Sequence, residues 1–429
     1  MALSTFFGSI AQKTTTGSQA YTGVGFQPSV LIFFFNDQTA EADALHLCCG
    51  LGVAAGASAE RAVANFGSDG GIDSVVAQRN ASCLRLDNGL GAVAEADLTS
   101  FDSDGFTLNW ATTDGTARLI AFLALGGSDL SNVACGSNAI PTTAVDDAIT
   151  GLGFEPDLVI VFSAYTDTTT DPNASLLANG SRLIGWGADG DSTGAGGAGG
   201  YFMHGGHATS ARHRKYALAT KIYASLSQGT LQGEASLKSM DSDGFTMNFS
   251  TAGSTARQHY WLALKGTFQK KTGAETQKTS TGTKATTGAG FQPTIAIFSA
   301  RNAVAGTTII SHMENSFGMA QSSSARGCIW AGGEENGSAG TRFRDQSLRT
   351  TKCILMRTEA GGTPSTNAEA DLTTLDSDGF TVNWTTADAT AREFYYLLLG
   401  SSAAAAQTVD MWHPRIEQQY PFQKEMVNY

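Results

Sequence analysis

A ten-residue stretch that begins at Phe101 constrains this chain more than any other feature, because it occurs three times. It reads Phe-Asp-Ser-Asp-Gly-Phe-Thr-Leu-Asn-Trp, and it returns with few changes from Met240 and from Leu375. The copies lie about 140 residues apart, whereas solenoid units repeat every ~20–50 residues. Each copy therefore marks a whole domain rather than one unit of a stacked array.

The size and composition of the chain suit globular domains. A length of 429 residues allows roughly two to four domains of ordinary size. Hydrophobic residues make up 41% of the chain and charged residues only 15%, which argues against a disordered protein. The 50 glycines favour many short strands joined by turns.

Two apolar patterns in each repeat predict strands. Phe106, Leu108 and Trp110 alternate with polar residues, so they share one face of a strand. The unbroken apolar run from Val30 to Phe35 follows Gly-Phe-Gln-Pro and is typical of a strand covered on both faces. Because proline fixes φ and has no N–H group, we expect Pro28 at the entry of this strand. The same patterns recur at 158–162 with 245–249, and at 295–298 with 380–384.

A Thr-Ala-Arg sequence and a second apolar run end each repeat. In the first repeat a turn at Asp114-Gly115 precedes the run from Leu119 to Leu125, and we interpret this run and the strand at Phe106 as a β-hairpin. The run is apolar on both faces, so its strand should be central or interfacial. The Thr-rich sequence from Gln12 to Gly17 predicts an exposed strand.

These patterns predict an all-β protein with three tandem β-sandwich, jelly-roll-like domains and an extended C-terminal arm. We expect an elongated molecule with domains at 1–127, 128–266 and 267–401 and the arm at 402–429. Linkers are expected at 127–139 and 266–276, the second of them polar and exposed. The stretch from Ala54 to Asn65 suits a short helix.

The charge and the N-terminal sequence limit the partners. A formal net charge of −12 argues against a nucleic-acid-binding protein, which would present a basic face. The first residues lack the basic start and long apolar core of a signal peptide. The run from Val30 to Phe35 is too short to cross a bilayer. We therefore expect a soluble protein made in a cytoplasm, without nucleic-acid or membrane partners.

The Asp-Ser-Asp-Gly sequence allows two interpretations. Alternate carboxylates before a glycine resemble the start of a calcium loop, although the further oxygen ligands and the closing Glu of an EF-hand are missing. In the preferred interpretation Asp accepts backbone hydrogen bonds and Gly takes a positive φ in a turn. The framework of the three repeats then consists of Asp102, Gly105, Phe106, Arg118, Asp241, Gly244, Phe245, Arg257, Asp376, Gly379, Phe380 and Arg392.

Histidines and cysteines offer little metal chemistry. His204, His207 and His213 are the best candidate cluster, but they occur only in the second repeat, without a helix or cysteine to fix their geometry. A surface loop is the preferred interpretation, so we predict neither a metal ion nor a cofactor. The six cysteines form no C-x-x-C pair. Cys48 and Cys49 are expected on two faces of one strand.

One of the cysteine positions is shared among the repeats. Cys83 and Cys353 occupy similar places in repeats one and three, where the second repeat has Ile222. A position that accepts both Cys and Ile indicates a small core hydrophobe rather than a ligand or a disulfide.

Recurring polar residues have two explanations. Asn109 and Arg118 recur in every repeat, and they either form hydrogen bonds within each domain or face a repeated partner surface. We favour the first explanation for the arginines, each of which should satisfy a carboxylate or carbonyl of its own domain. The recurring Glu95, Glu234 and Glu369 predict a structural charge that faces the arginine rather than a catalytic acid. Motifs of serine hydrolases, zinc proteases and nucleotide-binding loops are missing.

The segment after Thr408 differs from the repeats. It contains no glycine but two prolines and several aromatic residues. A short segment cannot bury so many rings alone, so we expect it to dock on a neighbouring domain or subunit. The expected docking residues are Trp412, Tyr420, Phe422 and Tyr429.

The order of these motifs resembles repeated β-domains in virion structural proteins of tailed bacteriophages. The shared features are Gly-Phe-Gln-Pro before an apolar strand, then Asp-Ser-Asp-Gly-Phe-Thr-x-Asn-Trp and Thr-Ala-Arg before a Leu-rich strand. The resemblance covers nearly the whole chain up to 401. It implies a non-enzymatic capsid decoration, head fibre, or tail or collar component. Such a protein would be assembled in the host cytoplasm with other virion proteins and further copies of itself.

Two other functions remain as hypotheses. A carbohydrate-binding receptor-recognition module on the particle surface would bind host glycans through exposed aromatic side chains, for which Trp186, Tyr201 and Trp330 are the candidates. A glycan depolymerase would need close acidic residues in a groove. The middle repeat departs most from the common pattern, with Glu155 in place of Gln and Phe249 in place of Trp.

Overall fold

The chain is built from antiparallel β-sheets in the computed structural model, which describes residues 2–67, 74–87, 91–163, 180–188, 198–204, 212–227, 230–306, 309–334, 344–358 and 364–402. No helix occurs within these ranges, so the predicted all-β class is confirmed. Each repeat contains a larger sheet of six or seven strands and a smaller sheet of four, which enclose a hydrophobic core.

The larger sheets share one strand order, in which the first strand of a repeat pairs with its last. In repeat 1 the order is β1 (Leu3–Ala11), β11 (Leu119–Gly127), β3 (Pro28–Asn36), β5 (Leu47–Gly56), β6 (Ala59–Gly67), β7 (Ser74–Arg79). In repeat 2 it is β12 (Leu130–Ala139), β21 (Gln258–Gly266), β14 (Leu158–Ser163), β15 (Gly180–Ala188), β16 (Ala198–His204), β17 (Arg212–Leu218), β25 (Ile310–Ser311). In repeat 3 it is β22 (Gln269–Thr276), β32 (Glu393–Gly400), β24 (Ile295–Arg301), β26 (Met313–Ala320), β27 (Arg326–Gly333), β28 (Arg344–Arg349), β4 (Ala42–Leu45).

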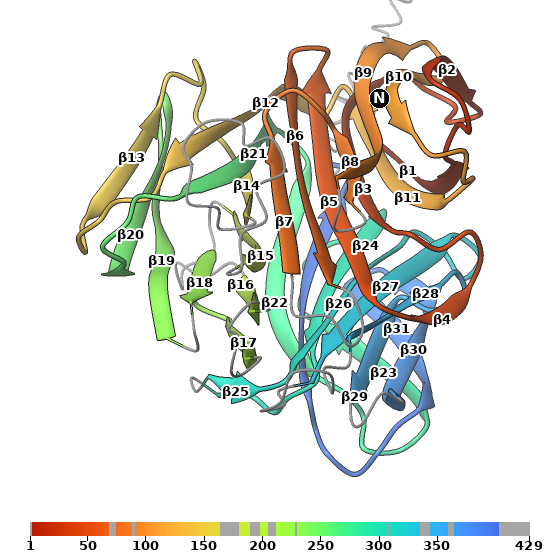
Figure 1. Ribbon diagram of the computed structural model, residues 1–429, viewed down its shortest axis with the longest axis vertical. Coiled ribbons are helices and arrows are strands. Elements are labelled where there is room, and N and C mark those ends of the chain that lie inside the picture. The colour runs from red at the N-terminus through yellow and green to blue at the C-terminus, as the bar shows by residue number, and fades with distance from the viewer. Residues whose placement is uncertain are drawn as a thin grey trace, which may run out of the picture.

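The smaller sheets also repeat one order and lie at three separate corners of the molecule, around the larger sheets (Figure 1). The first is β2 (Gly17–Thr22), β10 (Gly105–Thr113), β9 (Ala92–Asp102), β8 (Leu84–Asp87). The second is β13 (Asp146–Thr150), β20 (Gly244–Ala252), β19 (Thr230–Asp241), β18 (Tyr223–Ser227). The third is β23 (Gly282–Thr287), β31 (Gly379–Thr386), β30 (Ser365–Asp376), β29 (Ile354–Thr358).

Two strands leave their own repeat and extend the sheet of another. Strand β4 of repeat 1 pairs with β28 of repeat 3, and β25 of repeat 3 pairs with β17 of repeat 2. A histidine with a positive φ follows each of these strands, His46 at 69° and His312 at 64°. Such a left-handed residue turns the chain sharply, so that it can return to its own sheet as β5 or β26.

A hydrophobic core that is common to all three repeats lies between the larger sheets. On β3, Val30, Ile32 and Phe34 face this common core, while Leu31 and Phe33 face the sandwich core of repeat 1. Strands β14 and β24 in the other repeats, and the last strands β11, β21 and β32, alternate in the same way. The prediction that the last strand is central or interfacial is therefore confirmed. One face of this strand packs in the sandwich core of its own repeat, and the other face packs in the common core between the repeats.

The common core contradicts the expected elongated shape. Strands of every repeat contact strands of both other repeats. The apolar faces of three large sheets can only leave water by packing on one another, so the repeats gather around one centre instead of forming a row.

The expected hairpin between the strands at Phe106 and Leu119 is also wrong. Strand β10 pairs with β9 and β2 in the smaller sheet, whereas β11 pairs with β1 and β3 in the larger sheet. The turn at Asp114-Gly115 crosses from one sheet to the other, because β11 is apolar on both faces and must lie between two cores. The true hairpin joins β9 to β10 through Asp-Ser-Asp-Gly.

Three local expectations are wrong. The stretch Ala54 to Asn65 is the β5–β6 hairpin rather than a helix, because its side chains alternate between two cores. Gln12 to Thr16 is a connection between sheets rather than a strand. The expected linkers are mostly strand, since β12 and β22 begin at Leu130 and Gln269. The expected strand entry at Pro28 is confirmed.

Candidate functional site

The Asp-Ser-Asp-Gly turn uses both of its carboxylates in hydrogen bonds to the protein. Asp104 accepts bonds from the backbone N–H groups of Gly23 and Gly25 at 3.1 and 2.6 Å. Asp102 accepts bonds from the hydroxyls of Ser100 and Thr107, both at 2.7 Å. The same contacts recur in the other repeats, at Asp243 with Gly151 and Gly153, Asp241 with Ser239 and Thr246, Asp378 with Gly288 and Gly290, and Asp376 with Thr374 and Thr381.

These contacts favour the turn over the cation loop. The N–H groups of Gly290 and Gly288 hold the pKa of Asp378 below its ordinary value, as expected for a carboxylate bound by backbone donors. Among the described residues, no group of three or more His, Cys, Asp and Glu side chains could hold a metal ion.

The sequence patterns above do not identify the Gly-x-Gly segment whose N–H groups bind the Asp104 carboxylate. Gly23 and Gly25 have φ values of 90° and 84°, a conformation that other residues rarely adopt. Gly105 in the turn has a φ of 149°, and a Cβ atom there would lie 2.0 Å from the carbonyl oxygen of Tyr21. The signal was present, because Thr-Gly-x-Gly-Phe occurs in all three repeats at Thr22, Thr150 and Thr287.

The recurrent arginines form ion pairs within their own repeats. Arg118 binds both oxygens of Asp114 at 2.7 Å, and Arg392 binds Asp388 in the same way along the chain. The hydrogen bond from Arg118 is the main reason that the pKa of Asp114 falls to about 2. In repeat 2 the carboxylate is missing, because Gly253 stands four residues before Arg257. The within-domain hypothesis therefore holds in repeats 1 and 3.

The recurrent glutamates have structural partners, but these are not the expected arginines. Glu95 pairs with Arg79 at 3.1 Å and with Arg85, and Glu234 pairs with Lys221 at 2.7 Å. Burial opposes the charge of Glu95, but hydrogen bonds from Ser82 and Arg85 outweigh it, so its pKa lies below the ordinary value. The recurrent arginine of repeat 1, Arg118, lies in the connection between the sheets and pairs with Asp114 instead.

Glu369 and the recurrent Asn248 also contact residues of their own repeat. Glu369 lies 3.9 Å from Lys352 and accepts hydrogen bonds from Thr385 and Thr386. Asn248 donates a 2.7 Å bond to Asp146 on the neighbouring strand β13. Asn109 and Asn383 lie half-buried on the same face of their strands.

The predictions for the cysteines are confirmed. Cys48 faces the sandwich core and Cys49 the common core, and all six cysteines are free thiols. Cys83, Ile222 and Cys353 are fully buried, and each donates its N–H group to an alanine carbonyl of the neighbouring strand. They are core residues, as the Cys–Ile exchange indicates.

Several predicted site residues lie beyond what the structure describes. The arm residues Trp412, Tyr420, Phe422 and Tyr429 lie outside the described residues, as does His207. The side chains of His204, His213, Trp186 and Tyr201 are likewise outside this part. Trp330 is 1% exposed, and the Arg357 guanidinium lies 5.4 Å from its ring centre. It is therefore a core residue, and the expectation that it stacks on a glycan is wrong.

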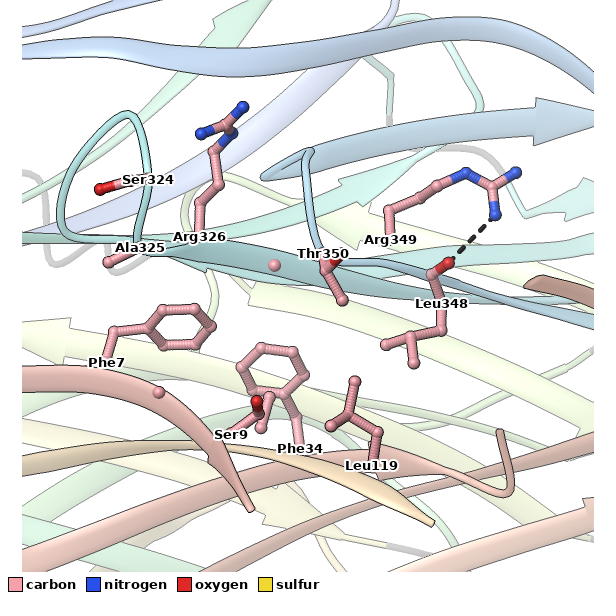
Figure 2. A pocket seen from close by; sticks show the side chains of 13 residues that line it. Phe7, Ser9, Phe34, Leu119, Ser324, Ala325, Arg326, Leu348, Arg349 and Thr350 are labelled. Atoms are coloured by element: carbon pink, nitrogen blue, oxygen red, sulfur yellow. Dashed lines mark hydrogen bonds between the residues drawn. The ribbon is translucent and has the colours of Figure 1, made fainter. Parts of the chain in front are cut away.

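A cavity of about 240 Å³ lies between repeats 1 and 3. Phe7 of β1 and Phe34 of β3 form one wall, and the side chain of Leu348 on β28 enters from the other (Figure 2). The guanidinium groups of Arg326 and Arg349 point away from these rings, toward their own partners (Figure 2). The cavity is thus apolar inside, with a polar rim.

The boundary between repeats 2 and 3 instead contains a buried ion pair. Lys215 on β17 binds Glu314 on β26, and both side chains are nearly inaccessible to solvent. Lys215 also donates a 2.9 Å bond to the carbonyl of Asn302. Burial lowers the pKa of Lys215 despite its partner.

The comparisons with known proteins give no further guide. No protein-family model matches the chain, and no curated protein matches it. In the part of the chain that the structure describes, there is also no helix with the length and apolar character needed to cross a membrane.

Proposed function

We propose that this protein is a non-enzymatic structural component of a phage virion, built as a single-chain counterpart of a trimer. It would decorate or build the particle as a capsid decoration, a head fibre, or a tail or collar component. Other virion proteins and further copies of the chain would be its partners.

The observation that carries the proposal is the common core, which gathers the three repeats around one centre. Symmetric particles offer binding positions related by rotation, and a body with three similar faces matches a threefold or near-threefold position. The three smaller sheets point outward at three corners (Figure 1). Each carries the same turn, with the same carboxylate contacts.

The use of the acidic residues supports a structural role over catalysis. Glu95, Glu234 and Glu369 each form ion pairs inside their own repeat. A catalytic carboxylate needs a cleft in which it meets a substrate. Carboxylates that pair with cations of their own repeat, at the same position in all three repeats, instead stabilise the fold.

Mass spectrometry of purified particles tests the proposal. Particles of the phage that encodes this chain should keep the protein through a high-salt wash, at a fixed copy number relative to the major capsid protein. Salt removes weakly attached surface proteins but leaves apolar interfaces intact. Particles that form normally and lack the protein would overturn the proposal.

A truncation separates the arm from the body. We expect a chain that ends at Ser402 to fold, because its cores are complete, but to be lost from the particle. Normal incorporation of this chain would refute docking by the arm and leave the structural role of the body standing.

A further inference from the structure

The cavity exists because two small residues stand where the neighbouring interface has large ones. Between repeats 2 and 1, Tyr260 packs under Arg61, with 5.8 Å between the guanidinium carbon and the ring centre. Tyr260 pairs with Phe162 on β14 just as Ala121 pairs with Phe34 on β3.

The second small residue is Gly327, and the strand pairing shows that it corresponds to Arg61. Arg61 pairs with Val53 in the β5–β6 hairpin, and Gly327 pairs with Met319 in the equivalent β26–β27 hairpin. A ring and a guanidinium therefore fill the interface of repeats 2 and 1, while Ala121 and Gly327 leave the same space open between repeats 1 and 3.

The size and lining of the space suit an aromatic ring. A dry cavity of about 150 Å³ holds a benzene molecule, so 240 Å³ accommodates a larger ring system. Phe7 and Phe34 lie with their ring centres 6.0 Å apart, and they offer apolar surface on one side. Ser9, Ser324 and Thr350 at the rim are exposed, so the cavity can be entered from solvent.

The C-terminal arm leaves the body close to this cavity. The N–H group of Ser402 donates to Asp129 at 2.7 Å, and Ser401 lies within 3.5 Å of the carbonyl of Leu3. Leu3 and Phe7 lie four residues apart on strand β1, a distance of about 13 Å. Trp412 follows Ser402 by ten residues, which can span up to ~33 Å.

We propose that the indole ring of Trp412 from the same chain fills the cavity between repeats 1 and 3. It would take the place that Tyr260 has in the neighbouring interface. The arm would then be anchored near its start, and Tyr420, Phe422 and Tyr429 would remain for a partner. The inference does not depend on a role in the virion.

Limited trypsin digestion of the full-length protein tests the anchor. Arg415 lies three residues after Trp412, and Lys424 provides a second site further along the arm. Cleavage of a docked segment follows the population of its open form. We expect Trp412→Ala to raise the cleavage rate at Arg415 by about ten-fold or more, and the control Tyr429→Ala to leave it unchanged. Equal rates in wild type and Trp412→Ala would overturn the proposal.

A second variant tests the place. Ser9→Phe puts a ring over the mouth of the cavity from an exposed position, so the fold should tolerate it. It should raise cleavage at Arg415 as much as Trp412→Ala does, and the double variant should show no further increase. Additive increases would place Trp412 elsewhere. Protection of Arg415 in the wild type should not change on dilution, because the ring and the cavity belong to one chain. Protection that disappears on dilution would assign the ring to a second copy and contradict the proposal.

Discussion

The two faces of each central strand differ in what they contact, and the difference explains how three similar repeats make one molecule. The face toward the sandwich core meets the same kinds of residue in repeats 1 and 3. Phe33 packs on Phe106 with 6.0 Å between ring centres, and Phe298 packs on Phe380 at 5.3 Å. The face toward the common core meets different partners at each boundary.

The boundary contacts show this variety. Repeats 1 and 3 meet through Phe34 and Phe317, with ring centres 5.3 Å apart. Repeats 2 and 3 share the buried Lys215–Glu314 pair. Contacts inside a repeat are thus copied with the repeat, while each contact between repeats had to arise separately.

The largest expected effect compares the two faces of β3. Phe34→Ala in the common core and Phe33→Ala in the sandwich core should each lower the free energy of unfolding by about 3–5 kcal/mol, because both rings are fully buried. Since the common core joins the repeats, both variants should shift one cooperative transition in calorimetry. A Phe33→Ala variant in which only a third of the heat absorption moves would show that the repeats unfold independently.

The ion pair between repeats 2 and 3 should produce an effect of similar size. Lys215→Ala removes the Lys215 ammonium group from the buried ion pair with Glu314, which costs about 3–5 kcal/mol. The double variant Lys215→Met/Glu314→Leu should recover most of this loss in chemical denaturation. Lys238, whose ion pair with Asp146 is exposed, provides the control, and Lys238→Ala should leave the midpoint unchanged. A double variant as unstable as Lys215→Ala would argue that the pair is required for specific assembly.

His259 breaks the similarity of the sandwich cores and makes repeat 2 sensitive to acid. It stands where the other repeats have Ile120 and Phe394, and burial lowers its pKa to about 4. The unfolded chain has a histidine pKa of about 6.5, so between about pH 6.5 and 4 the unfolded state binds more protons than the folded state. The free energy of unfolding therefore decreases as the pH is lowered through this range. We expect a loss of about 3 kcal/mol between pH 6.5 and 4.

The matched variant His259→Phe should remove this part of the pH dependence and raise stability at pH 7. The measurement is chemical denaturation at several pH values. The same slope in wild type and His259→Phe would exclude His259 as its source.

The smallest effect concerns the crossing between the sheets. Arg118→Ala should cost about 1 kcal/mol or less, because Asp114 is partly exposed and solvent screens the pair. The pKa of Asp114 is lowered to about 2, so the contribution is present above the unfolded value near 4 and is lost as the pH falls toward 2. An unchanged melting temperature for both Arg118→Ala and Arg392→Ala would contradict the within-repeat role of these arginines.

The sequence predicts the contacts that are copied and misses those that are not. Alternation at Phe106, Leu108 and Trp110, the turn at Asp102 and the double burial of the last strand follow from patterns that occur three times. The sequence at Asp114-Gly115 predicts a hairpin instead of a cross-over, because a short turn looks the same within one sheet and between two. The burial of both faces of β11 was the available clue.

Contacts between repeats could not be predicted from one chain. Strand β4 has only four residues, and their sequence does not indicate that the strand pairs with β28. Left-handed His46 and His312 mark both strand exchanges, but histidine occurs in many other conformations. The cavity depends on Ala121 and Gly327, whose small size has meaning only beside Tyr260 and Arg61 in the folded molecule.

Small-angle X-ray scattering of the full-length chain tests the central claim, that the three repeats share one core. A compact body of 429 residues has a radius of gyration of about 22 Å. Three separate domains of the same total length laid end to end would exceed ~30 Å by the same scaling. We predict a value near the compact one, with a bell-shaped Kratky plot. A value above ~30 Å, typical of separate domains in a row, would contradict the common core.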